Sequence, residues 1–132
     1  MNAKGDVVID LVILDDHPIR SLGVSRLLNR LPDMKVAAVC LSATDALSVI
    51  RDLQPKVVVA DLHDAMVSAA EFTRAVHAAA EGARVIIVTK NEVDATKFRA
   101  SGVAGVISEN AIARLPDGVR ETSSGSPWVQ YS

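Results

Sequence analysis

Apolar residues along the chain follow two alternating patterns. Segments rich in valine and isoleucine recur as nearly continuous runs, which are typical of strands that are covered on both faces of a sheet. The segments that we expect to form strands are residues 7–14, 36–39, 57–60, 85–88 and 103–107.

Between these runs the apolar residues recur at helical spacing. The expected helices begin at Pro18 and cover residues 18–31, 44–53, 69–80, 94–101 and 110–122. Pro116 and the Asp117-Gly118 pair lie inside the last segment, so that helix is expected to be short, bent or split. Five alternations of strand and helix predict an α/β domain with a parallel sheet and right-handed crossovers.

Composition narrows the class of protein. The 132 residues are enough for one domain, and 49% hydrophobic with 23% charged residues excludes a disordered tail, a collagen-like repeat and a disulfide framework. The net charge of -2 argues against non-specific nucleic-acid binding. Cys40 is the single cysteine, which fits a reducing compartment. Without an apolar run of about 20 residues or a signal peptide, we expect a cytoplasmic protein that does not enter a membrane.

The end of the chain differs from the rest in composition. Residues 1–122 contain all the expected strands and helices. The next residues, Ser123-Ser124-Gly125-Ser126-Pro127, have the composition of a linker. We therefore expect a folded domain over residues 1–122 and a linker or tail over residues 123–132.

Carboxylates gather where the predicted strands end. Asp15 and Asp16 follow the first strand and Asp61 follows the third, and ligands of doubly wound sheets bind outside these strand ends. Three carboxylates in a small volume must bind a cation or take up a proton, and oxygen ligands favour Mg²⁺. A carboxylate beside Mg²⁺ can accept a phosphoryl group, and Thr89 ends the next strand with a hydroxyl. The plain alternatives are that Asp15 and Asp16 only cap the first helix, and that Thr89 is an ordinary strand residue.

Four sequence pieces, in this order, resemble the receiver domain of two-component response regulators: LDDHP, PKVVVADL, RVIIVT and SGVAGVI. The opening LVILDDHPIRSLGVSRLLNRLPDMKV is similar to the LuxR/NarL subclass, whose output domain is a DNA-binding helix-turn-helix. The resemblance implies a flavodoxin-like fold, three layers with five parallel strands in the order 2-1-3-4-5.

The same resemblance implies roles for individual residues. Asp61 matches the phosphate-accepting aspartate, and Asp15 and Asp16 match the pair that binds Mg²⁺. The backbone carbonyl of His63 matches a further metal ligand, and Thr89 matches the switch hydroxyl.

Two residues depart from the pattern of the family. Glu109 stands where the family carries the fifth-strand lysine that contacts the phosphoryl group, and Val106 stands where it carries the switch aromatic. Lys90, which follows Thr89, is a candidate substitute for that lysine. It can also pair with Glu109 or Asp61, or face solvent.

Two hypotheses follow from these matches and departures. In the first, the chain is the signal-input domain of a two-component transcription regulator, phosphorylated on Asp61 by a sensor histidine kinase and controlling its own helix-turn-helix domain. In the second, it is an atypical receiver that works without phosphorylation as a protein-interaction or dimerisation module. Both expect a homodimer, formed through the first and last helices, and no direct contact of this domain with nucleic acid. Beyond self-phosphorylation and self-dephosphorylation at Asp61 we expect no enzymatic activity. A third hypothesis is a separate Mg²⁺-dependent phosphotransfer enzyme.

Overall fold

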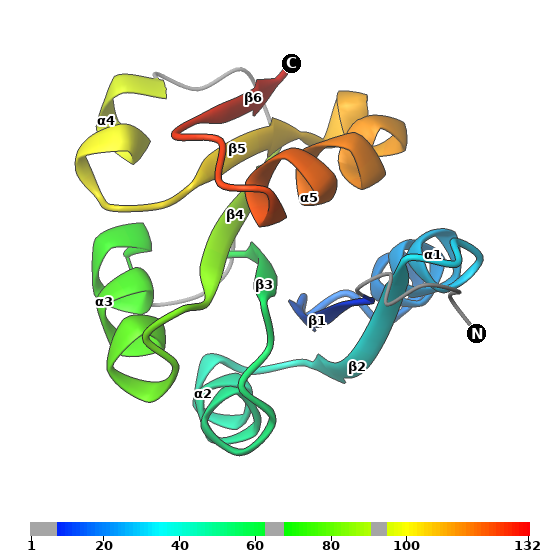
Figure 1. Cartoon of the computed structure of the whole chain (residues 1–132), viewed down its shortest axis with the longest axis horizontal. Helices are drawn as coiled ribbons and strands as arrows, with labels where there is room; N and C mark the ends of the chain where they lie inside the picture. The colour runs from blue at the N-terminus through cyan, green and yellow to red at the C-terminus, as the bar shows by residue number, and fades with distance from the viewer. Residues whose placement is uncertain (1–7, 63–67, 91–94) are drawn as a thin grey trace.

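Six parallel strands form one sheet, in the order β2-β1-β3-β4-β5-β6 (Figure 1). The computed structural model describes residues 8–62, 68–90 and 95–132. The strands are β1 (Ile9–Leu14), β2 (Met34–Cys40), β3 (Val57–Asp61), β4 (Arg84–Thr89), β5 (Gly105–Ser108) and β6 (Val129–Tyr131). The helices are α1 (Pro18–Asn29), α2 (Ala43–Leu53), α3 (Ala69–Ala79), α4 (Ala95–Ala100), the 3-10 helix η2 (Glu109–Arg114) and α5 (Leu115–Ser123).

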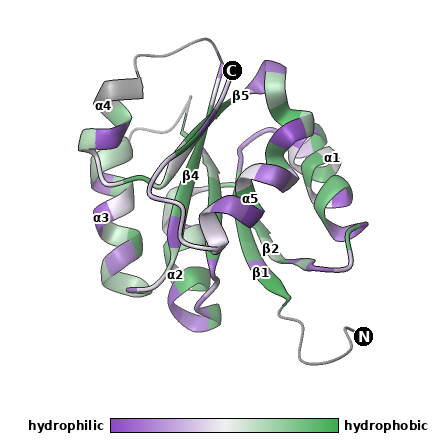
Figure 2. Cartoon of the chain, turned by 45° about the horizontal axis from the view of Figure 1, so that its top comes forward, coloured by the Kyte–Doolittle hydropathy of each residue, from purple (hydrophilic) through white to green (hydrophobic). Residues whose placement is uncertain are grey.

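Helices cover both faces of the sheet and bury two separate apolar clusters (Figure 2). On one face, α1 and α5 pack through residues such as Leu28 and Leu115, which are fully buried. On the other face, α2 and α3 pack through Ile50 and Phe72, also fully buried. Because successive strand residues point to opposite faces, the continuous valine and isoleucine runs supply both clusters, as their pattern predicted.

The helix ends follow the local sequence. Ser42 caps α2 by accepting a hydrogen bond from the backbone N–H of Asp45 (3.2 Å), and Ser68 caps α3 in the same way through Glu71 (3.1 Å). Pro116 lies in the first turn of α5, where a missing N–H costs nothing, so the last helical segment divides into η2 and α5. No helix in the described ranges is long and apolar enough to cross a membrane.

The predicted strand order 2-1-3-4-5 is confirmed, but the expected number of five strands is wrong. Residues 129–131, expected to be part of a linker or tail, form β6 and pair with β5. The pairing depends on Gly105, because a Cβ at that position would lie 2.6 Å from the carbonyl oxygen of Val129. The serine- and glycine-rich stretch before β6 is thus the connection from α5 back to the sheet, and its composition gave no sign of the short strand after it.

Candidate functional site

Three carboxylates reach the same side of the sheet because they continue the alternation of their strands. The strand residues two positions before them pack in the cluster on the α1 side: Ile13, Val59 and Ile107. A step of two residues keeps a side chain on the same face. It therefore places three acidic residues beside the start of α1: Asp15 after β1, Asp61 at the end of β3, and Glu109 after β5.

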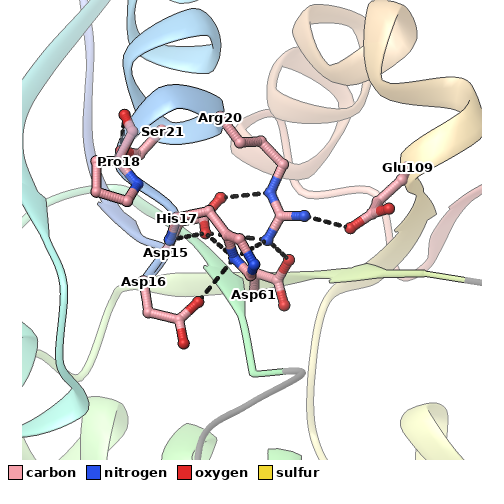
Figure 3. Close-up of polar contacts among 8 residues, drawn as sticks. All are labelled: Asp15, Asp16, His17, Pro18, Arg20, Ser21, Asp61 and Glu109. Atoms are coloured by element: carbon pink, nitrogen blue, oxygen red, sulfur yellow. Dashed lines mark hydrogen bonds and ion pairs between the residues drawn. The ribbon is translucent and has the colours of Figure 1, made fainter.

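The guanidinium of Arg20 binds all three of these carboxylates (Figure 3). Its Nε donates to Oδ2 of Asp15 at 2.8 Å, and its Nη1 donates to Oε1 of Glu109 at 2.6 Å. Its Nη2 donates to Oδ2 of Asp61 at 2.5 Å and to Oδ1 of Asp15 at 3.0 Å. One cation from the first turn of α1 therefore joins the ends of β1, β3 and β5.

The cluster is buried at its base and open at its rim. The side chains of Asp15 and Asp61 are 6% and 4% exposed, whereas those of Arg20 and Glu109 are 29% and 26% exposed. Burial alone would raise the pKa of the Asp15 carboxyl, but hydrogen bonds from Arg20 and from the backbone N–H of His17 outweigh it and lower that pKa. The hydrogen bonds to Asp15 likewise raise the pKa of Arg20, so the guanidinium stays charged.

Asp16, the second aspartate of the pair, forms no ion pair with Arg20 among the residues that the structure describes. Oδ1 of Asp16 is 2.8 Å from Nδ1 of His17, and the Asp16 side chain is 44% exposed. The same His17 nitrogen lies 2.9 Å from Nη2 of Arg20. Asp16 is therefore accessible from solvent at the edge of a site whose base is already held by Arg20.

Two of the carboxylates that the sequence predicts as metal ligands, those of Asp15 and Asp16, lie together at the start of α1. Ligand atoms of Asp15, Asp16 and His17 lie within 4.8 Å of one another, and Nη2 of Arg20 contacts carboxylate oxygens of both Asp15 and Asp61 at once. Nη2 of Arg20 thus lies between carboxylates from two strand ends, and a divalent cation bound to both Asp15 and Asp61 would take the place of this nitrogen. His63, whose backbone carbonyl the resemblance assigns to the metal, lies outside the described residues.

Thr89 and Lys90 lie at the end of β4. Thr89 is buried at the end of β4, level with Ser108 of β5, and it shares the alternation of Val85 and Ile87 on the α3 side of the sheet. Lys90 is exposed. Within the described part of the chain, the ion pair to Glu109 comes from Arg20 and none comes from Lys90.

Arg20 is the site residue that sequence reasoning missed. Its signal was present, because an excess of carboxylates at the strand ends needs a cation, and Arg20 is a basic residue in the turn of helix that follows the acidic pair. Side chains in a helix lean toward its N-terminus, and the N-terminus of α1 faces the strand ends.

Sequence comparison places the chain beside bacterial response regulators. It is 25% identical over 125 residues to the response regulator GacA of Pseudomonas aeruginosa, and the alignment covers 92% of this chain and 58% of GacA. It is 22% identical over 127 residues to the transcriptional regulatory protein LiaR of Bacillus subtilis, with 93% of this chain and 60% of LiaR covered. The chain thus spans less than two thirds of the length of these curated relatives. No family model matches the sequence.

Structural comparison also finds response regulators. A two-component response regulator of the LuxR family from Aurantimonas sp. SI85-9A1 superposes with a TM-score of 0.84 and 27% identity, over 92% of this chain and 89% of that one. The signal receiver domain of the NarL protein from Mycobacterium tuberculosis superposes with a TM-score of 0.78 over 90% of this chain and 98% of its own, and at 23% identity that match supports the fold.

Proposed function

Because this chain is a receiver domain of the LuxR/NarL type of response regulator, we propose that it is the signal-input domain of a two-component transcription regulator and that Asp61 is its phosphoryl acceptor. The observation that supports the proposal is the place of Asp61, buried at the end of β3 next to Asp15 at the end of β1. The partners that we propose are a sensor histidine kinase as the phosphoryl source and a DNA-binding helix-turn-helix output domain.

The proposed chemistry is one phosphoryl transfer and its reversal by water. A carboxylate oxygen of Asp61 attacks the phosphorus of a phosphohistidine, and an O–P bond forms as the P–N bond breaks. The electron pair stays on the imidazole nitrogen, which then takes a proton from water. Attack of water on the phosphorus later releases inorganic phosphate and restores the carboxylate.

The chain supplies residues on both sides of this acceptor. Asp15, Asp16 and Asp61 would hold Mg²⁺, with the backbone carbonyl of His63 as a further ligand. Bound there, the ion offsets negative charge on the transferring group. Thr89 is the proposed switch hydroxyl, and Lys90, exposed at the next position, remains available at the rim.

A second candidate function is favoured by the contacts of Arg20. The guanidinium pairs with both Asp15 and Asp61, so a side chain of this chain supplies positive charge to the acceptor site. A receiver of this kind can act as an interaction or dimerisation module without phosphorylation. Under both functions we propose a homodimer through α1 and α5.

Intact-mass spectrometry decides between the two functions. The chain is incubated with acetyl phosphate, with and without Mg²⁺, beside Asp61→Asn and a control, Asp52→Asn, which changes an exposed aspartate of α2. We expect one phosphoryl adduct that needs Mg²⁺, is present in Asp52→Asn and is lost in Asp61→Asn. Folded protein without an adduct would contradict the acceptor role and favour the second function.

A further inference from the structure

We propose that Arg20 takes the place of the missing fifth-strand lysine and binds the phosphoryl group on Asp61, with Glu109 holding the guanidinium in position. This inference rests on the proposed function of Asp61. It assigns the positive charge of the site to α1 instead of to the end of β5.

The contacts of Arg20 are those that a phosphoryl-binding cation needs. Nη2 already touches Oδ2 of Asp61 at 2.5 Å, and an acyl phosphate places its oxygens within a few bond lengths of that atom. The guanidinium is a planar fork of donors that matches phosphoryl oxygens better than a lysine ammonium does. Its 29% exposed side chain can follow the added group without leaving the site.

Glu109 has a defined part in this arrangement. A glutamate in place of the lysine would add one more negative charge beside the phosphoryl group. Here its Oε1 instead accepts a hydrogen bond from Nη1 of Arg20 at 2.6 Å. Glu109 therefore fixes Nη1, while Asp15 fixes Nε of the same guanidinium. Arg20 and Glu109 thus form a charge-exchanged pair, in which the cation comes from α1 and the carboxylate comes from the position after β5 where the family carries the lysine.

The alternative source of a cation is Lys90, and the structure gives it no such support. Glu109 pairs with Arg20, and Lys90 is exposed at the end of β4. Arg20 is also better placed than Lys90 by alternation, since it meets Asp15, Asp61 and Glu109 on the α1 side of the sheet, where all three point.

The test measures binding of beryllofluoride, a mimic of the phosphoryl group, in the presence of Mg²⁺, by ¹⁹F NMR. The variants are Arg20→Ala, Glu109→Lys and the double variant, which returns the cation to the fifth strand. Arg26→Ala removes an exposed arginine from the same helix and is the matched control for loss of one positive charge. Circular dichroism checks that each variant is folded.

We expect Arg20→Ala to weaken beryllofluoride binding at least about tenfold, the equivalent of one charge-assisted hydrogen bond. Arg26→Ala should bind like the wild type, and adding Glu109→Lys to Arg20→Ala should restore most of the lost affinity. If Arg20→Ala does not fold, Lys90→Ala in the wild-type background carries the test. A loss of beryllofluoride affinity in Lys90→Ala assigns the phosphoryl contact to Lys90 and overturns the role of Arg20.

Three results would overturn the inference. Equal binding by Arg20→Ala and wild type removes Arg20 from the phosphoryl site while leaving Asp61 as acceptor. If the double variant binds beryllofluoride and the wild type does not, Arg20 does not replace the lysine. Absence of binding in all variants, together with absence of an Asp61 adduct, overturns the proposed function as well, so the two failures can be told apart.

Discussion

At the scale of single residues, an ion pair outside the candidate site joins α5 to the turn that follows α1. Asp33, in the turn between α1 and β2, accepts from Nε and Nη2 of Arg120 on α5 at 2.8 and 3.1 Å. The hydrogen bonds from Arg120 lower the pKa of the Asp33 carboxyl below its usual value of 3.8. Since the two side chains are 35% and 42% exposed, the pair contributes at most about 1 kcal/mol to the free energy of unfolding.

This pair predicts a pH dependence of a definite sign. A carboxyl whose pKa is lower in the folded state stabilises the protein above its unfolded pKa and loses that effect as the pH falls through the folded pKa. Asp33→Asn should therefore be less stable than wild type at pH 7, by no more than about 1 kcal/mol, and the difference should shrink below about pH 4. Urea unfolding at both pH values measures it, with the exposed Asp52→Asn as control. An equal difference at pH 7 and at low pH would contradict the assignment to ionised Asp33.

The residues of the candidate site were predictable to different degrees. Asp15, Asp16 and Asp61 stand at the ends of strands that the sequence marks clearly, so their convergence follows from the fold alone. The contact between Arg20 and Glu109 joins residues 89 positions apart and depends on how α1 packs against the start of η2, which no local pattern specifies.

At the scale of elements, β6 depends on the close approach of two backbones at Gly105. A Cβ there would lie 2.6 Å from the carbonyl oxygen and 2.9 Å from Cβ of Val129. Gly105→Ala should separate β6 from β5 and lower the free energy of unfolding by about 1–3 kcal/mol. The fluorescence of Trp128, the single tryptophan, should change with it, since this residue precedes β6 and its ring stacks with Arg99.

The matched substitution for this prediction is Gly23→Ala. Gly23 lies inside α1, and a Cβ there would meet nothing within 4 Å. Alanine should therefore stabilise the helix by about 0.5–1 kcal/mol and leave Trp128 fluorescence unchanged. If Gly105→Ala were as harmless as Gly23→Ala, the observed register of β5 and β6 would be wrong.

The elements also differ in how well sequence patterns predict them. The first five strands and the capped helices α2 and α3 follow from long apolar runs and from Ser42 and Ser68. A strand as short as β6 has too few residues for a period to be visible. Its pairing is set instead by Gly105 and by the packing of α5.

At the scale of the whole molecule, the α1 side carries exposed apolar surface beside the site. Ile19 and Leu22 on α1 are 88% and 50% exposed. Arg20, Leu27, Glu109 and Ile112 contribute to the lining of an apolar groove of about 300 Å³ between α1 and η2. The Arg20–Glu109 pair is therefore part of the wall of this groove, next to the surface proposed for dimerisation.

This surface predicts how dimerisation responds to substitution. Glutamate at both Ile19 and Leu22 should weaken the homodimer at least about tenfold, because each charge must be desolvated at an apolar interface. Sedimentation equilibrium measures the dissociation constant. Leu53→Glu, which changes an exposed leucine at the end of α2, is the control and should have no effect. A wild type that stays monomeric, or a dimer that tolerates both glutamates, would contradict the proposed interface.

We propose that the Arg20 guanidinium holds the acceptor site and follows the group bound at Asp61. Side-chain NMR of ¹⁵N-arginine, with Arg20 assigned through Arg20→Lys, observes that guanidinium directly. We predict that the Nε–H signal of Arg20 is protected from exchange with water by its hydrogen bond to Asp15. We also predict that the Nη signals shift when Mg²⁺ and beryllofluoride are added to the wild type, and that they do not shift in Asp61→Asn. An Arg20 signal that exchanges like that of the exposed Arg26, or that ignores beryllofluoride bound at Asp61, would contradict the claim.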